Sequence, residues 1–153
     1  MTTIDQLMAE AIRRRDENLV LSQAYQKTLN WLMPANFLLV VGAAILSLVA
    51  GATILIENSF LTRVQSGILA LVSGAFTIVH SKLGCEQYQS ECKKLMSFHR
   101  GIASDYDNLL TAGEVEDFRK RIMALNDQVS AVLKSSTALP FESAVEKARK
   151  HIR

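Results

Sequence analysis

Charge is what this sequence lacks over a long central stretch. Between Lys27 and Lys82 the only charged side chains are Glu57 and Arg63, which leaves charge-free windows of 29 residues (28–56) and 18 residues (64–81). A helix needs about 20 apolar residues to cross a hydrocarbon core roughly 30 Å thick. The first window is longer than this and the second is close to the lower limit. The sequence therefore predicts a transmembrane hairpin at 28–81, with spans at about 35–56 and 64–81.

Two other interpretations of the first window fit less well. The apolar region of a signal peptide is typically about 7–15 residues long and lies near the N-terminus, whereas 27 residues precede this window, Asp5, Glu10 and Asp16 among them. A soluble core helix normally carries a polar stripe, yet Ser47 and Thr53 are the only polar side chains in 37–56. A membrane span remains the best account.

Basic residues near the ends of the spans predict the orientation. Cytoplasmic loops carry an excess of Lys and Arg. The connecting loop, 57–63, has one basic residue, whereas each flank has four: Arg13, Arg14, Arg15 and Lys27 on one side, Lys82, Lys93, Lys94 and Arg100 on the other. Both termini are therefore expected in the cytoplasm. Trp31 comes just before the first span, where an indole favours the headgroup level, and we expect it to be an interface anchor.

Small and polar residues are patterned within the predicted spans. Small residues at four-residue spacing let helix backbones approach closely; they are Ala43, Ser47 and Gly51 in the first span and Ser66, Ala70 and Gly74 in the second. Their expected role is packing of the hairpin on itself. The second span also carries Ser66, Ser73, Thr77 and His80 along one broad face. Polar groups in a membrane face protein or water, so these four residues are candidates for a pore lining, which requires several copies of the chain.

The remaining parts predict amphipathic cytoplasmic helices before the hairpin (1–27) and after it (82–153). The first shows helical spacing of Ile4, Leu7, Met8, Ala11 and Ile12. The second span is expected to continue as one long helix, since little in the sequence stops it before Gly101, and Gly113 is expected to interrupt it. Along it runs a heptad-like row suited to a partner helix: Cys85, Tyr88, Cys92, Leu95, His99, Ile102, Tyr106 and Leu109. A second apolar stripe follows, made of Val115, Phe118, Ile122, Leu125, Val129 and Val132. We call these two stripes the seam.

The sequence also lacks the motifs of catalysis and of cofactor binding. It has no phosphate-cradling glycine loop and no nucleophile motif, so we expect neither an enzyme nor a cofactor. Cys85, Cys92 and His99 are seven residues apart, or about 10.5 Å along a helix, too far for one zinc ion or an intrachain disulfide. The net charge of +2 is spread over several helices, which gives no reason to expect nucleic-acid binding.

This layout resembles the SLATT family, the two-transmembrane effector domains associated with bacterial nucleotide-signalling conflict systems. The resemblance covers about residues 1–135. It is carried by the basic N-terminal helix, the Tyr25 to Trp31 segment, two spans with a very short loop, and a long helix from Cys85-Glu86-Gln87-Tyr88 to Tyr106-Asp107-Asn108-Leu109-Leu110. It implies an effector in the bacterial inner membrane that oligomerises and permeabilises or depolarises that membrane in antiphage defence. It also implies gating by a nucleotide second messenger or a nucleotide-signalling partner protein.

Two alternatives stay open at this stage. The hairpin could serve only as an anchor for a helical scaffold that recruits a partner. A holin-like permeabiliser also has short spans, although it rarely has so long a cytoplasmic part. Deletion of residues 111–153 is expected to be harmless in a holin-like protein and disabling in the other two.

Overall fold

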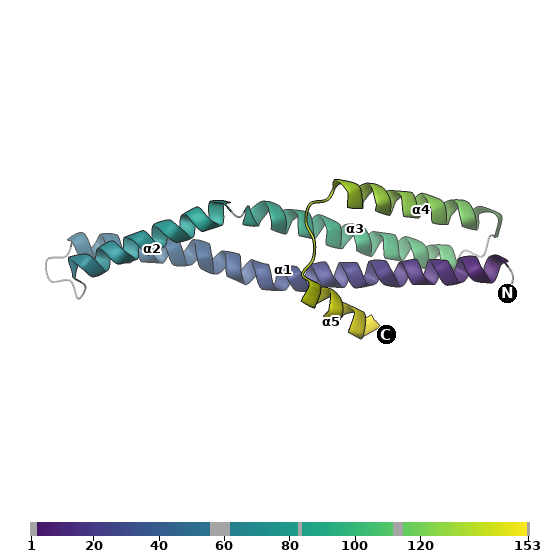
Figure 1. Cartoon of the computed structure of the whole chain (residues 1–153), viewed down its shortest axis with the longest axis horizontal. Helices are drawn as coiled ribbons and strands as arrows, with labels where there is room; N and C mark the ends of the chain where they lie inside the picture. Colours follow the sequence, from purple (N-terminus) through teal and green to yellow (C-terminus); the bar gives the residue numbers. More distant parts are fainter. Residues whose placement is uncertain (1–2, 56–61, 83, 112–114, 153) are drawn as a thin grey trace. The chain divides into compact units, whose positions relative to one another are not determined.

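The computed structural model describes residues 3–55, 62–82, 84–111 and 115–152, and all of the secondary structure in these ranges is α-helical. Five helices follow one another (Figure 1): α1 (Thr3–Leu55), α2 (Arg63–Lys82), α3 (Cys85–Thr111), α4 (Val115–Ser135) and α5 (Glu142–Ile152). The prediction of an all-helical fold is confirmed for these residues. The expected loop 57–63 falls mostly outside the described residues, as do the end of the first span, Gly113 and the side chain of Val115.

The chain divides into two compact units. The first, which we call the bundle, comprises Met1–Leu29 and Ser90–Arg153. The second, which we call the hairpin, comprises Asn30–Gln89. Helix α1 runs through both units, and Pro34 lies inside it. The boundary expected between residues 27 and 28 is therefore a change from charged to uncharged side chains within one helix, not a break between helices.

The expectation of one continuous helix from the second span to Gly101 is wrong. α2 ends at Lys82 and α3 begins at Cys85, and Gly84 between them has a φ of 55°. Glycine enters this left-handed region without the steric penalty of a Cβ atom, which is why helices often end next to one. Gly101 lies in the interior of α3 and does not interrupt it. The helix therefore stops at the glycine beside the last span residues and continues through the later one.

The core of the bundle is formed by three helices. Ala11 of α1, Tyr106 of α3 and Ile122 of α4 meet in one cluster, together with Ile102, Leu109 and Phe118. α4 runs beside α3, and α5 lies on the other side of α1 (Figure 1). α5 packs through small side chains, because Ala144 and Ala148 contact Ala24 of α1. Small residues at a helix contact allow the two backbones to lie close together.

Candidate functional site

The hairpin is held together by hydroxyl groups that point inward. Ser73 of α2 is 4% exposed, and its Oγ donates to the carbonyl oxygen of Ala43 at 2.7 Å. Ser47 Oγ lies 3.1 Å from the same Ser73 Oγ. Because the single Ser73 proton goes to Ala43, Ser47 is the donor in this second bond. The predicted packing residues Ala43 and Ser47 thus meet a residue that was also predicted to line a pore.

A second pair of hydroxyls joins the helices nearer to the predicted loop. Thr53 Oγ1 and Ser66 Oγ are 2.6 Å apart, and Ser66 is 5% exposed. Each hydroxyl has one proton, so one of them donates across to the other helix while the other donates to its own backbone acceptor, which is the carbonyl of Ala50 for Thr53 (2.8 Å) and that of Thr62 for Ser66 (3.2 Å). Bonds of this type between helices contribute roughly 0.6–1.7 kcal/mol each in membranes. The hydroxyls of Ser47, Thr53, Ser66 and Ser73 therefore face the neighbouring helix.

Large apolar side chains cover the outside of the hairpin. Leu38, Leu48 and Leu71 are each more than 70% exposed. Two helices of the structure are long and apolar enough to cross a membrane, and only 6% of each apolar window is buried within the chain. A core helix of a soluble protein has the opposite arrangement, with its apolar residues inside. An apolar exterior over a polar interior needs a lipid or protein covering.

The four pore-lining candidates occupy different environments. Ser66 and Ser73 face α1, as described above. Thr77 is exposed, and its Oγ1 donates to the carbonyl of Ser73 at 3.1 Å within the same helix. His80 is half-buried, and its Nε2 atom is buried without a hydrogen-bond partner among the described residues. The lining role concerns an assembly of several chains and stays a prediction.

The other predicted packing residues lie away from the contact between the two helices. Gly51, Ala70 and Gly74 are exposed, and a Cβ atom added at either glycine would have no neighbour within 4 Å. Within one chain these glycines are therefore not needed for close approach, and any packing role would involve another molecule. Trp31 is 64% exposed, and its role as an anchor also stays a prediction.

The seam residues are distributed over both units. Cys85 and Tyr88 are half-buried residues of the hairpin, whereas Cys92, Leu95 and His99 are buried in the bundle. On α4, the buried residues are Phe118 and Ile122, and the half-buried ones are Leu125, Val129 and Val132. In the bundle, this surface packs against the N-terminal part of α1, since Ala11 and Leu7 belong to the same core.

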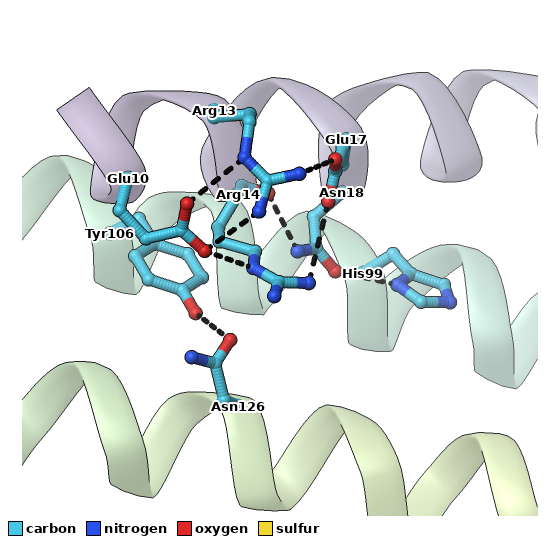
Figure 2. Close-up of polar contacts among 8 residues, drawn as sticks. All are labelled: Glu10, Arg13, Arg14, Glu17, Asn18, His99, Tyr106 and Asn126. Atoms are coloured by element: carbon cyan, nitrogen blue, oxygen red, sulfur yellow. Dashed lines mark hydrogen bonds and ion pairs between the residues drawn. The ribbon is translucent and has the colours of Figure 1, made fainter.

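His99 is the most unusual polar residue of the bundle. It is 0% exposed, stacks on Tyr25 at a ring separation of 5.9 Å, and meets the edge of Phe98. Its Nδ1 atom lies 2.8 Å from Asn18 Oδ1 (Figure 2). Asn18 uses its amide nitrogen to donate to the carbonyl of Arg14 at 2.8 Å. This fixes the amide so that its oxygen faces the imidazole, and Nδ1 must then carry the proton.

The other ring nitrogen of His99 is left without a partner. Nε2 is buried and has no hydrogen-bond partner among the described residues. Protonation would place a charge in this apolar site, and burial therefore lowers the pKa of His99 from 6.5 to about 4. The imidazole is neutral at physiological pH, where it acts as a buried hydrogen-bond donor and a flat packing surface.

Charged residues form a ladder along the N-terminal part of α1. Arg13 and Arg14 both bond Glu10 at 2.8 Å, and Arg13 also reaches Glu17 at 2.8 Å (Figure 2). Hydrogen bonds from Arg13, and then from Arg14, hold the pKa of Glu10 below its usual value of 4.5. Arg15 connects α1 to α3 through Asp107 at 3.0 Å. These pairs are largely solvent-exposed, where water and salt screen the attraction, so they contribute little to stability.

Residues 136–141, which we call the strap, join α4 to α5 without helical structure. Thr137 donates from its backbone N and from its Oγ1 to the Glu91 carboxylate, at 2.7 and 2.8 Å. Tyr25 donates to the carbonyl of Ala138 at 3.0 Å, and Thr28 Oγ1 accepts from the backbone N of Phe141 at 3.1 Å. The two bonds from Thr137, backbone first, lower the pKa of Glu91. The strap is therefore fixed to α1 and α3 at three points.

Sequence reasoning missed the buried polar row of α1. Asn18, Ser22 and Tyr25 are buried and spaced by four and three residues, which is the helical period of Ala11 and Leu29. Ile4, Met8 and Ile12, which gave the apolar signal in this part of the sequence, are exposed instead. A polar row at helical spacing could have been noticed, but its hydrogen-bond partners on α3 and the strap are distant in the sequence.

Few features of the described structure suit a cofactor. No group of three or more His, Cys, Asp or Glu residues in the described ranges is placed to hold a metal ion. A hollow of about 520 Å³ lies between α1 and α5, lined by Arg13, Asp16, Glu17, Val20, Leu21, Val145, Arg149 and Ile152. Two basic and two acidic side chains balance one another there, so charge selects no class of ligand. Comparison of the chain with family models, curated proteins and solved structures found no match.

Proposed function

We propose that the chain is a two-span membrane protein whose hairpin crosses the bilayer and whose bundle lies in the cytoplasm. The observation that carries this proposal is the reversed polarity of the hairpin, with Leu38, Leu48 and Leu71 outside and the hydroxyls of Ser66 and Ser73 inside. In hydrocarbon, polar groups need partners within the protein. The basic flanks of the two spans support cytoplasmic termini.

Within that frame, the function is that of an effector that oligomerises and permeabilises or depolarises the bacterial inner membrane. The resemblance to SLATT proteins supports this function, together with antiphage defence and control by a nucleotide signal or a partner protein. The described hairpin suits a closed form, because its serine hydroxyls bond the neighbouring helix instead of facing outward. Opening would require α2 to rotate or to move away from α1, so that these hydroxyls are exposed to water. Exposed Gly51 and Gly74 offer smooth surfaces for contacts between copies.

The test is the membrane potential of bacteria during controlled expression, followed with a voltage-sensitive dye and a propidium uptake control. We expect prompt depolarisation by the full chain, or depolarisation once the activating partner is co-expressed. Two variants separate lining from packing at matched expression. Thr77→Val removes an exposed hydroxyl without changing shape and should weaken conduction if this face lines the path. Ser73→Ala removes a contact within the hairpin and should lower the threshold for opening.

One observation favours a second function, a membrane-anchored scaffold. Ser66 and Ser73, two of the four polar candidates, are already occupied within the hairpin, which leaves the outer face with little polarity. A scaffold predicts that replacing both spans with an unrelated hairpin preserves function, whereas a pore predicts loss. A stable potential in cells that express the chain with each of its genomic neighbours would decide for the scaffold. A holin-like action would survive deletion of residues 111–153, although this deletion removes the α4 side of the bundle core.

A further inference from the structure

Two buried polar atoms of the hairpin have no hydrogen-bond partner among the described residues. They are Oδ1 of Asn36 on α1 and Nε2 of His80 on α2. Both residues are half-buried, and both belong to the same compact unit, Asn30–Gln89. A polar atom that is buried without a partner costs folding free energy, most of all in hydrocarbon. This pair of atoms therefore needs an explanation.

The register of the two helices places Asn36 and His80 opposite each other. Asn36 lies seven residues before Ala43 on α1, and His80 lies seven residues after Ser73 on α2. Ala43 and Ser73 are buried and in contact, since the Ser73 hydroxyl donates to the Ala43 carbonyl at 2.7 Å. The helices are antiparallel, and seven residues are close to two turns, or about 10.5 Å along each helix. Asn36 and His80 therefore continue the two contacting faces at one level.

The same register holds at the contacts on either side. A step of seven residues in the other direction leads to Ala50 on α1 and to Ser66 on α2, and both are buried. There Thr53 Oγ1 lies 2.6 Å from Ser66 Oγ and 2.8 Å from the carbonyl oxygen of Ala50. Beyond Asn36, the side chain of Gln89 donates to the carbonyl of Leu32 at 3.1 Å. Contacts within the hairpin thus lie on both sides of the two unpartnered atoms.

A water molecule fits the donor and acceptor chemistry of these atoms. Oδ1 of Asn36 only accepts, whereas Nε2 of His80 donates in one tautomer and accepts in the other. Water can donate to Oδ1 and can either donate to or accept from Nε2, so it satisfies both atoms in either tautomer. Buried waters typically bond such otherwise unsatisfied groups. A metal ion fits less well, because one amide oxygen and one imidazole are too few ligands.

We propose that Asn36 and His80 form a water-binding site inside the hairpin, in which one buried water molecule bridges Oδ1 of Asn36 and Nε2 of His80. Along α2, every seventh residue then reaches α1 through a polar group: Ser66 and Ser73 directly, and His80 through water. The site depends on the packing of α2 on α1 and not on conduction. Failure of the membrane-potential test would therefore leave it in place.

The test is water-edited solid-state NMR of the full chain in vesicles of phosphatidylethanolamine and phosphatidylglycerol. His99→Gln and His151→Gln leave His80 as the only histidine, so ¹⁵N-labelled histidine reports on this ring alone. In this background, magnetisation transfer from water to Nε2 is compared with that in two further variants. Asn36→Leu removes the amide at similar volume. Thr77→Val is the matched control, because it removes a hydroxyl of α2 that bonds the carbonyl of its own helix.

We expect the transfer to Nε2 to fall about twofold or more in Asn36→Leu and to stay unchanged in Thr77→Val. Equal transfer with and without the Asn36 amide would overturn the water site. So would a direct hydrogen bond between the two side chains, detected as magnetisation transfer between Nε2 and the labelled Asn36 amide.

A second measurement keeps the natural histidines and follows unfolding of the hairpin in a denaturing detergent. Asn36→Leu and His80→Leu should each lower the midpoint, because each leaves the other polar atom without its bridge. The double variant should lose less than the sum, since it removes both polar groups. Additive losses, or a higher midpoint in either single variant, would overturn the shared site.

Discussion

Replacement of buried His99 by glutamine should remove a specific part of the pH dependence of stability. The pKa of His99 is lowered by burial to about 4, whereas an unfolded chain has the ordinary value of 6.5. As the pH falls below 6.5, His99 becomes protonated in the unfolded state but stays neutral in the folded state. Stability that is fully present above pH 6.5 is therefore lost progressively as the pH falls toward 4.

The size of the effect follows from the difference between the two pKa values. A shift of one pKa unit corresponds to about 1.4 kcal/mol, so the complete loss, reached near pH 4, is about 3 kcal/mol. Between pH 7 and pH 5 the same relation gives a loss of about 2 kcal/mol. For a unit the size of the bundle this should lower the melting temperature by roughly 10 °C. Glu10 and Glu91 have pKa values below 4.5. They therefore contribute little to the change in stability between pH 7 and pH 5.

The assay is thermal unfolding of the full chain in detergent, followed by circular dichroism at several pH values from 7 to 5. His99→Gln keeps a side-chain donor for Asn18 and cannot titrate in this range, so its melting temperature should change much less with pH. His151→Gln is the matched control, because His151 is exposed in the last turn of α5. Equal pH slopes for wild type and His99→Gln would refute the reasoning. So would an NMR titration of the His99 ring with a midpoint near 6.5.

Three further predictions concern packing. Tyr25→Phe should cost about 1–3 kcal/mol by leaving the carbonyl of Ala138 buried and unpaired, and should speed proteolysis at the strap. An unchanged cleavage rate would argue against a role of the Tyr25 hydroxyl in fixing the strap. Ser73→Ala should weaken the hairpin by roughly 0.6–1.7 kcal/mol through loss of the bond to Ala43, measured by titration with a denaturing detergent, and no change would mean that the bond contributes nothing. Ile122→Ala should destabilise the bundle by about 2–5 kcal/mol, seen as a lower melting temperature, and a loss below 1 kcal/mol would show that the site relaxes.

The helices themselves were predictable because their signals are local. The charge-free windows mark the apolar parts of α1 and α2, and steps of three and four residues from Phe118 to Val132 mark α4. The break at Gly84 was also signalled, since a glycine that follows a lysine in the last turn is a common helix end. It was missed because the heptad-like row begins at Cys85, one residue later, and this row predicts a helix that continues from the second span.

The polar contacts were not predictable in the same way. Periodicity shows that Ser73 and Thr77 share a face of α2, but it cannot show that Ser73 meets Ala43, 30 residues away in the sequence. Asn18 and His99 are 81 residues apart. Such pairs depend on which helix faces which, a property of the three-dimensional packing and not of either helix alone. A polar residue in an apolar stripe therefore indicates a buried hydrogen bond, while its partner is found only in the structure.

The inward hydroxyls also bear on how a pore and a closed hairpin could share the same residues. Separating α2 from α1 would break the bonds that Ser73 makes with Ala43 and Ser47 and the bond between Ser66 and Thr53. At roughly 0.6 kcal/mol each, these three bonds contribute about 2 kcal/mol in total. Hydrogen bonds from these hydroxyls to water in an open path would offset most of that loss. The polar bonds alone then hold the hairpin closed only weakly. In the proposed effector, a modest difference in binding energy between the closed and open forms is enough for a ligand or a partner to shift the equilibrium.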